Sequence, residues 1–193
     1  MKFPSPGMTR GLRSWVAFAL AAAVMLSVAC GGAQSPPSRG VIESDLGGWR
    51  FRRFQKLLDT EVWVKGNRGV AFAATYVRGS ALRRGRLGDA DVVSAVVTRF
   101  KEPRAIEPAF VALMRRLARE SGYSVKEREI DDAWVIEVRG FGEAWTWWTA
   151  GRHVVKVGGK GREQVPEAVV EAYLDRYASA LAAQALDAPL LAP

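Results

Sequence analysis

The side chains most often used in catalysis are scarce in this chain, which has one histidine, His153, among 193 residues. A hydrolytic site of the Ser-His-Asp type would have to use His153, and no Gly-x-Ser-x-Gly motif accompanies it. His153 lies between Arg152 and Val154 in a segment that we expect to be a strand, where a structural or surface role is the commoner one. The sequence therefore gives little support to nucleophilic catalysis.

The carboxylates do not form a recognisable catalytic pair. Asp131 and Asp132 are adjacent, and turn formation explains both of them. Glu137 and Glu143 fall on neighbouring predicted strands and could meet by register, whereas paired-carboxylate hydrolysis needs two acids facing each other across a cleft. We therefore expect a protein that is not an enzyme.

A glycine-rich run, Gly158-Gly159-Lys160-Gly161, lies between a predicted strand and a predicted helix. The spacing of a phosphate-binding P-loop fails, because Val154 occupies the place of its first glycine and Gly161 the place of its Ser or Thr. A flexible connection explains the run better. Lys156, Lys160 and Arg162 could still contact an anion.

The segment Trp145-Thr146-Trp147-Trp148 is the most distinctive part of the chain. On an extended strand Trp145 and Trp147 project to one face and Trp148 to the other. Aromatic side chains can line a site for a small molecule, a lipid or a peptide, but they can equally fill the core beneath helices. Both interpretations stay open, and Trp145, Trp147 and Trp148 are the candidate ligand-binding residues.

A second aromatic segment, Trp49 to Phe54, carries three arginines, Arg50, Arg52 and Arg53. Interleaved aromatic and basic residues are typical of contact with a membrane surface or an anion. As a strand, the same segment would bury its aromatic rings and leave the arginines in water.

Cys30 is the only cysteine, and it follows an apolar run from Ser14 to Ala29. Lys2, Arg10 and Arg13 give the residues before this run a positive charge, which is the order of parts in a secretory signal. The run is too short to cross a bilayer, which needs about 20 residues. The alternatives are a secreted protein with a leftover cysteine and an uncleaved, short membrane helix.

The residues around this cysteine, Leu26-Ser27-Val28-Ala29-Cys30, resemble the lipobox of bacterial lipoproteins, although Leu26 stands one place upstream of the preferred leucine. The resemblance implies cleavage before Cys30 and a thioether-linked diacylglycerol on its sulfur. It also implies a cell-envelope location, with the outer membrane as the default in a host with two membranes because Gly31 is not the aspartate that retains lipoproteins at the inner membrane.

The resemblance divides the chain. Residues 1–29 are the expected signal peptide, residues 30–40 the lipidated cysteine and a flexible tether, residues 41–185 a single folded domain, and residues 186–193 a frayed tail. The remaining 164 residues are enough for one domain with a sizeable core.

The chain has 28 Lys and Arg against 20 Asp and Glu; without Lys2, Arg10 and Arg13 the balance is 25 against 20, or +5. For an exported protein this moderate basicity favours an anionic lipid or an acidic envelope polymer as a partner, and not nucleic acid. The alternative is an arginine-rich surface that has no partner. A lipidated Cys30 leaves no thiol for a disulfide or a metal site. No cofactor is indicated.

The periodicity of apolar residues predicts an α+β fold in which an antiparallel β-sheet has about three helices packed on one face. The expected strands are Trp49–Phe54, Glu61–Lys65, Val70–Arg78, Tyr123–Ile130, Ala133–Arg139, Glu143–Thr149 and Arg152–Val157. The expected helices run from Asp89 or Asp91 to Phe100, from Glu107 to Glu120, and from Pro166 to about Leu181. Loops are expected over Gly79–Gly88 and Gly158–Gly161.

These observations favour a membrane-anchored envelope lipoprotein whose soluble α+β domain binds a protein or another envelope component without catalysis. The alternative is a small-molecule or lipid-binding module with an aromatic pocket at Trp145, Trp147 and Trp148. A concave apolar cavity would favour the second class.

Lipidation is tested by the mass of the intact protein purified from membranes of its native host. We expect the mass of residues 30–193 plus lipid, because cleavage precedes Cys30 and the sulfur is then acylated. The variant Cys30→Ser should carry no lipid. An uncleaved or unlipidated wild-type chain would contradict the lipoprotein assignment.

Overall fold

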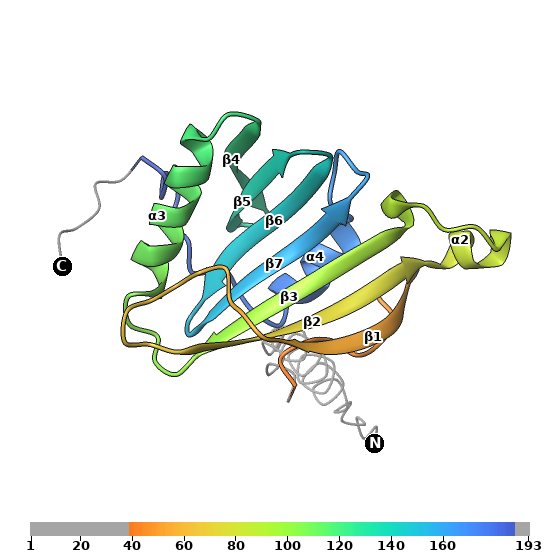
Figure 1. Cartoon of the computed structure of the whole chain (residues 1–193), viewed down its shortest axis with the longest axis horizontal. Coiled ribbons are helices and arrows are strands. Elements are labelled where there is room, and N and C mark those ends of the chain that lie inside the picture. The colour runs from red at the N-terminus through yellow and green to blue at the C-terminus, as the bar shows by residue number, and fades with distance from the viewer. Residues whose placement is uncertain (1–38, 188–193) are drawn as a thin grey trace, which may run out of the picture. The chain divides into compact units, whose positions relative to one another are not determined.

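A computed structural model describes residues 39–187, which form one antiparallel sheet with helices against it (Figure 1). The predicted signal peptide, Cys30, most of the predicted tether and residues 188–193 lie outside the described residues. No helix within residues 39–187 is long and apolar enough to cross a bilayer.

The described elements make an α+β domain in which the sheet dominates. The strands are β1 (Trp49–Leu57), β2 (Gly69–Arg78), β3 (Val92–Phe100), β4 (Tyr123–Ile130), β5 (Ala133–Gly140), β6 (Glu143–Ala150) and β7 (His153–Lys160). The helices are α2 (Gly79–Arg84), α3 (Ile106–Arg119) and α4 (Glu167–Leu174), with a 3-10 turn, η1 (Asp89–Asp91), before β3. The α+β prediction is confirmed at this level.

The sheet consists of two meanders joined in the middle. The strand order is β1-β2-β3-β7-β6-β5-β4, so the first meander is β1 to β3 and the second is β4 to β7. The joining pair runs antiparallel from Ser94 opposite Gly158 to Arg99 opposite His153. One continuous sheet therefore depends on contact between strands that are far apart in the sequence.

The helices lie on both faces of the sheet. Trp147 and Trp148 are neighbours on β6 and therefore point to opposite faces. Phe110 of α3 contacts Trp147, while Tyr177, just after α4, accepts a hydrogen bond from Nε1 of Trp148. We call the Trp147 side the front face and the Trp148 side the back face; Figure 1 shows α3 in front of the sheet and α4 behind it. The expectation that all helices share one face was wrong.

The helix predicted between Asp89 and Phe100 is also wrong, because residues 92–100 form strand β3. The valines that share a helical stripe also alternate: Val93, Ala95 and Val97 are fully buried on the back face. Strand β3 hydrogen-bonds to β2 on one side and to β7 on the other. β-Branched side chains fit this pleated, central position better than a helix.

Three other boundaries differ from prediction. Residues 61–65 form no strand and lie in the loop between β1 and β2, whereas Gly79–Gly88 contains helix α2. The helix after Pro166 ends at Leu174, so Tyr177 and Leu181 reach the core from the segment that follows it.

The predicted glycine loop belongs partly to strand β7, which continues to Lys160. A Cβ at Gly158 would overlap the carbonyl oxygen of Ala144 on β6, so this glycine permits close strand packing. The chain turns only at Gly161, where φ is +65°.

Other predictions are confirmed. Helix α3 agrees with the expected Glu107–Glu120 helix to within one residue at each end. The four C-terminal strands form the expected meander. Strand β1 covers the expected Trp49–Phe54 strand. Asp131 and Asp132 make the tight turn between β4 and β5, with φ of 45° and 64°.

Three tyrosines fasten the first described residues to the back face. Tyr76 donates a hydrogen bond to the Ile42 carbonyl, and its hydroxyl lies 2.8 Å from that of Tyr173. The Tyr173 hydroxyl accepts from the Ile42 amide at 3.0 Å, and Tyr177 donates to the Gly40 carbonyl at 2.8 Å. Burial raises the pKa of all three phenols, that of Tyr177 to about 12, so they stay protonated donors at neutral pH.

The last described residues return to the front face. Arg115 of α3 donates to the carbonyls of Leu186 at 2.7 Å and Ala185 at 3.0 Å. Glu127 of β4 accepts from the amides of Leu186 and Gln184 at 2.6 and 2.8 Å. Packing therefore continues past residue 185, where the frayed tail was expected to begin.

Replacing Tyr173 by Phe tests the tyrosine cluster. The Ile42 amide would lose its acceptor in a buried place, so we expect the free energy of unfolding to fall by about 1–3 kcal/mol. Urea unfolding followed by tryptophan fluorescence measures the loss. Tyr123→Phe is the matched control, because Tyr123 is only partly buried, and it should change stability by less than about 0.5 kcal/mol. Equal effects of the two variants would contradict the role of the cluster.

Candidate functional site

An open pocket of about 950 Å³ lies among the described residues. It lies on the back face, where β1 begins, β2 ends and α4 starts. Its lining includes five arginines, which we call the arginine pocket: Arg50, Arg78, Arg83, Arg128 and Arg162. This pocket is the strongest candidate for a binding site.

Each arginine comes from a different segment of the chain. Arg50 lies on β1, Arg78 at the end of β2, Arg83 on α2, Arg128 on β4 and Arg162 just after β7. Glycines let these elements approach one another. A Cβ at Gly47, where φ is +47°, would lie 2.5 Å from the Cβ of Ala168 in the first turn of α4.

Trp49 forms one wall of the pocket. It is almost fully buried, and it pairs with Arg78 across β1 and β2. The guanidinium carbons of Arg78 and Arg162 lie 5.1 and 5.6 Å from the centre of a Trp49 ring. Two cations are thus held against one aromatic ring, which favours this arrangement through cation–π attraction.

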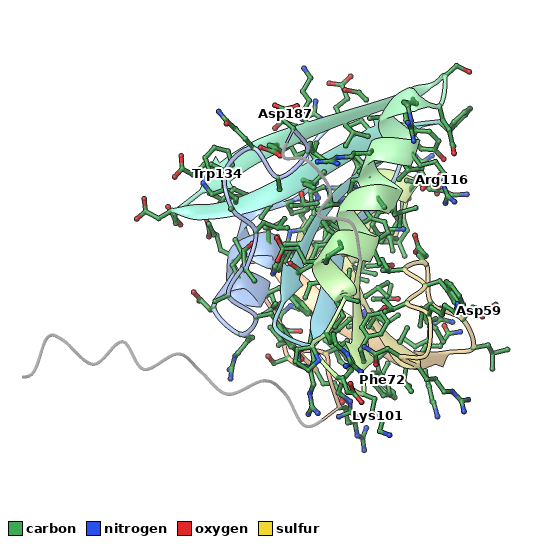
Figure 2. All side chains as sticks on the ribbon, turned by 90° about the vertical axis from the view of Figure 1, so that its left-hand side faces the viewer. Asp59, Phe72, Lys101, Arg116, Trp134 and Asp187 are labelled. Carbon is green, nitrogen blue, oxygen red and sulfur yellow. The ribbon has the colours of Figure 1, made fainter. Side chains whose placement is uncertain are left out.

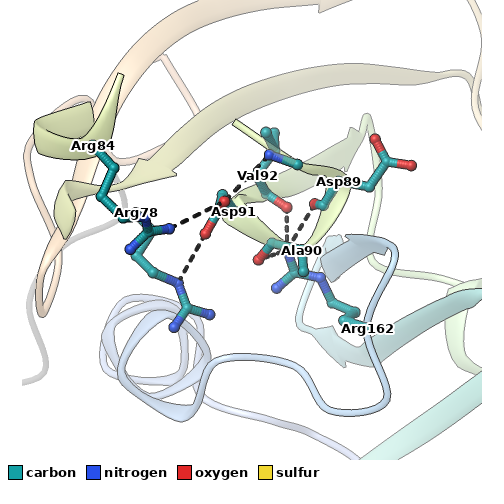
Figure 3. A network of polar contacts seen from close by, with 8 residues as sticks. Arg78, Arg84, Asp89, Ala90, Asp91, Val92 and Arg162 are labelled. Atoms are coloured by element: carbon teal, nitrogen blue, oxygen red, sulfur yellow. Dashed lines mark hydrogen bonds and ion pairs between the residues drawn. The ribbon is translucent and has the colours of Figure 1, made fainter. Parts of the chain in front are cut away.

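Arg162 is the most deeply placed of the five arginines. Its Nη2 donates to the carbonyls of Ala90 at 3.2 Å, Asp89 at 3.5 Å and Val92 (Figure 3). Its Nε is buried and has no hydrogen-bond partner within the described part of the chain. Burial lowers the pKa of Arg162, and the nearby positive charge of Arg78 lowers it further. A bound anion would favour the charged guanidinium here.

Acidic neighbours balance only part of the charge. Asp91 lies 3.5 Å from Arg78 and 3.6 Å from Arg84, as Figure 3 shows. Asp45 pairs with Arg50, whose hydrogen bond lowers the pKa of the Asp45 carboxyl.

On the other side of the pocket, Arg128 contacts Glu137 at 3.0 Å and Glu167 at 2.8 Å. Arg83 has no ion pair among the described residues.

The balance of the lining is positive. Five arginines line the pocket against two acids, Asp45 and Glu167, and two further acids, Asp91 and Glu137, pair with Arg78 and Arg128 from outside the lining. Guanidinium groups bind carboxylate and phosphate oxygens through paired hydrogen bonds. The pocket is therefore suited to an anion. Within residues 39–187 no group of three His, Cys, Asp or Glu side chains is placed to hold a metal ion.

The three candidate tryptophans do not form a common site. Trp148 is fully buried on the back face, where its Nε1 donates to the Tyr177 carbonyl at 2.6 Å. Trp147 is buried on the front face against Phe110 of α3. Trp145 is partly buried on the front face and donates to Glu143 at 2.8 Å. This arrangement favours core packing over the predicted ligand site at Trp145, Trp147 and Trp148.

A lysine joins the two front-face tryptophans. The Lys156 ammonium lies 3.9 Å from the centre of a Trp145 ring and 4.4 Å from that of Trp147. It also pairs with Glu61 at 2.8 Å. Lys156 is therefore engaged in packing, and it does not share a site with Arg162.

The other residues considered for catalysis stay apart. His153 lies 3.3 Å from the Ala150 carbonyl and contacts the edge of Tyr177, and the described residues give it no carboxylate partner. Glu137 and Glu143 point to opposite faces, where they pair with basic residues.

The basic segment of β1 divides between two surroundings. Arg50 belongs to the arginine pocket, whereas Arg52 and Arg53 are exposed along the outer strand of the sheet, beside a register shift between Phe51 and Arg53. Sequence reasoning found Arg50 and Arg162 as candidate anion contacts but missed Arg78, Arg83 and Arg128. Only the strand order shows that these five residues converge.

In comparisons with known proteins, the chain matches no family model, no curated protein and no solved structure. The site must therefore be interpreted from its own geometry.

His153 gives a pH dependence of stability. Burial lowers its pKa below the ordinary value of 6.5, so the unfolded chain binds the proton more readily than the folded one. This contribution to stability is complete above the unfolded pKa and is lost as the pH falls through it toward the folded pKa. We expect the midpoint of thermal unfolding to fall less between about pH 7.5 and 5.5 in His153→Gln than in the wild type. Identical slopes would contradict the assignment.

Proposed function

We propose that this protein is a non-enzymatic binding protein of the cell envelope, and that its domain binds an anionic group of an envelope component in the arginine pocket. The observation that carries the proposal is the convergence of five arginines, from four elements and one loop, on one open cavity of about 950 Å³. A cavity of this size accommodates a ligand larger than a single ion.

The electrostatics of the pocket support an anionic ligand. Arg78 and Arg162 are held close together beside Trp49, although like charges repel. An anion between them would relieve this repulsion, and Arg83, which has no ion pair in the described part of the chain, is available to bind it. Phosphate and carboxylate groups are the chemical classes that this geometry recognises.

The anchoring part of the proposal comes from the signal sequence. The lipobox-like residues before Cys30 support attachment to a membrane, with the outer membrane as the default in a host with two membranes. A domain of this kind would then meet envelope components and not nucleic acid.

The aromatic-pocket alternative has less support. A small-molecule or lipid site would need Trp145, Trp147 and Trp148 around one cavity, and no described pocket is lined by all three. A small cavity beside Trp147 has a volume of only about 20 Å³.

Charge removal at Arg83 tests the proposed site. The probe is inorganic pyrophosphate, a small anion with several negative charges. Calorimetric titration should show that it binds about tenfold more weakly to Arg83→Gln than to the wild type. A charge-assisted hydrogen bond contributes about 1.5–3 kcal/mol, which corresponds to a factor of this order. Binding should also weaken as salt rises, because the pocket is open and therefore screened.

Arg119→Gln is the matched control for this titration. Arg119 is an exposed arginine in the last turn of α3 and does not line the pocket, and its replacement removes the same charge from the whole protein. The control should bind pyrophosphate as the wild type does. Equal weakening in both variants, or no binding by the wild type to either pyrophosphate or citrate, would contradict the proposed site.

A further inference from the structure

The loop between β1 and β2, residues 58–68, exposes two large apolar side chains at one end of the sheet. Leu58 is fully exposed and Trp63 is 75% exposed. Among the described residues two other large hydrophobic side chains are exposed, Leu87 and Phe141, and both lie at the opposite end of the sheet. Within residues 39–187, the 58–68 loop therefore carries every exposed large apolar side chain of its own end of the sheet.

The fold holds this loop in position. Val62 and Val64, on either side of Trp63, are buried in the core. The Asn67 amide donates to the Val64 carbonyl at 3.0 Å, and the Asn67 side chain exchanges hydrogen bonds with the backbone of Glu102 at 2.8 and 3.2 Å. Because its neighbours point inward and are tied down, Trp63 is directed outward by the structure itself.

Basic residues surround the exposed pair. The Lys101 amide donates to the Arg68 carbonyl at 3.3 Å, and Val70, next to the loop, pairs with Arg99 of β3. The exposed basic side chains of this end are Lys56, Lys65, Arg68, Arg99 and Lys101. Of the acidic side chains in residues 58–68 and 101–104, Glu61 is paired with Lys156 and Glu102 with Arg104, whereas Asp59 has no ion pair among the described residues. Figure 2 views the domain from this end, with Lys101 and Asp59 labelled.

The described chain also begins at this end. The guanidinium of Arg39 lies 5.6 Å from the centre of the Phe54 ring, and a Cβ at Gly40 would lie 3.1 Å from the ring of Phe72. Phe72 pairs with Lys56, two residues before Leu58. Residue 39 is nine positions after Cys30, and nine extended positions span at most about 30 Å. A lipid on Cys30 therefore keeps this end of the domain close to the bilayer.

We infer that the 58–68 loop is a membrane-contacting surface, with Trp63 at the level of the head groups, Leu58 inserted beyond it, and the surrounding lysines and arginines on anionic lipid. The inference rests on the anchoring part of the proposed function. Tryptophan prefers the interface between water and hydrocarbon, and clustered basic side chains are attracted to anionic lipid surfaces. An apolar tip inside a basic ring fits both preferences.

This orientation places the arginine pocket away from the membrane. Arg50 and Leu58 stand at opposite ends of β1, whose nine residues cover about 30 Å. The pocket would then receive an anionic group from the surrounding compartment and not from the lipid that holds the protein.

Site-directed spin labelling tests the inference on the full chain, purified from host membranes and reconstituted into vesicles containing phosphatidylglycerol. Lipidation of Cys30 is checked by intact mass, and a lipidated Cys30 leaves an introduced cysteine as the only thiol. A label on Leu58→Cys should be accessible to oxygen dissolved in the bilayer and protected from a water-soluble nickel chelate. The matched control is Phe141→Cys, at the opposite end of the sheet, whose label should show the reverse.

The outcomes separate the two proposals. A lipidated protein whose label at position 58 is as accessible to nickel as the label at 141 would overturn the membrane contact and leave the anchoring intact. Spin–spin broadening at position 58 in place of oxygen access would show that a second copy of the chain covers the loop, which also overturns the inference. An unlipidated Cys30 would overturn the anchoring and the inference together. The protection should decrease in vesicles of phosphatidylcholine alone, and unchanged protection there would remove the role given to the basic residues.

Discussion

The pairing of β3 with β7 is the constraint on which the rest of the structure depends. It joins two meanders, each of which is built from local hairpins, into one sheet of seven strands. The arginine pocket needs this joint, because Arg50, Arg78 and Arg83 come from the first meander and the helix between β2 and β3, whereas Arg128 and Arg162 come from the second meander and the residues after it. The core needs it as well, since Tyr76 of β2 reaches Tyr173 of α4 only when the two halves form one back face. Gly158 permits the close packing of β7 with β6 that this central position requires.

Local patterns predicted the local parts of the fold. Helix α3 and the strands β4 to β6 have clear periodicity and turn residues, and each could be placed from its own sequence. The segment 92–100 could not, because Val93, Val96 and Val97 fit both a helical stripe and one or the other face of a strand, and only the partners β2 and β7 decide between them. The arginine pocket could not be predicted from local sequence either, because its residues lie far apart along the chain. Arg50 was a candidate because aromatic rings accompany it, whereas Arg78 and Arg128 are ordinary exposed strand arginines until the strand order brings them together.

The tryptophan-rich strand shows how a conspicuous segment can serve packing. Trp147 and Trp148 fill the front and back layers of the core from adjacent positions, so a single strand supplies large rings to both. On the front face the ammonium of Lys156 contacts the rings of Trp145 and Trp147 and pairs with Glu61. The basic and aromatic composition that suggests a binding site on β6 is thus used internally. Positive charge is also present at both ends of the sheet, around the arginine pocket and around the 58–68 loop.

The tyrosine cluster has a mechanical consequence. Any force applied to the chain ahead of residue 39 reaches the domain first at Gly40 and Ile42, whose backbone groups are held by Tyr177, Tyr76 and Tyr173. These hydrogen bonds are buried and come from β2 and from the region of α4, so the load is shared between a strand of the sheet and the layer behind it and does not fall on the outer strand β1 alone. For a domain anchored as we propose, through a lipid on Cys30, such a reinforced point of attachment would resist being pulled away from the sheet.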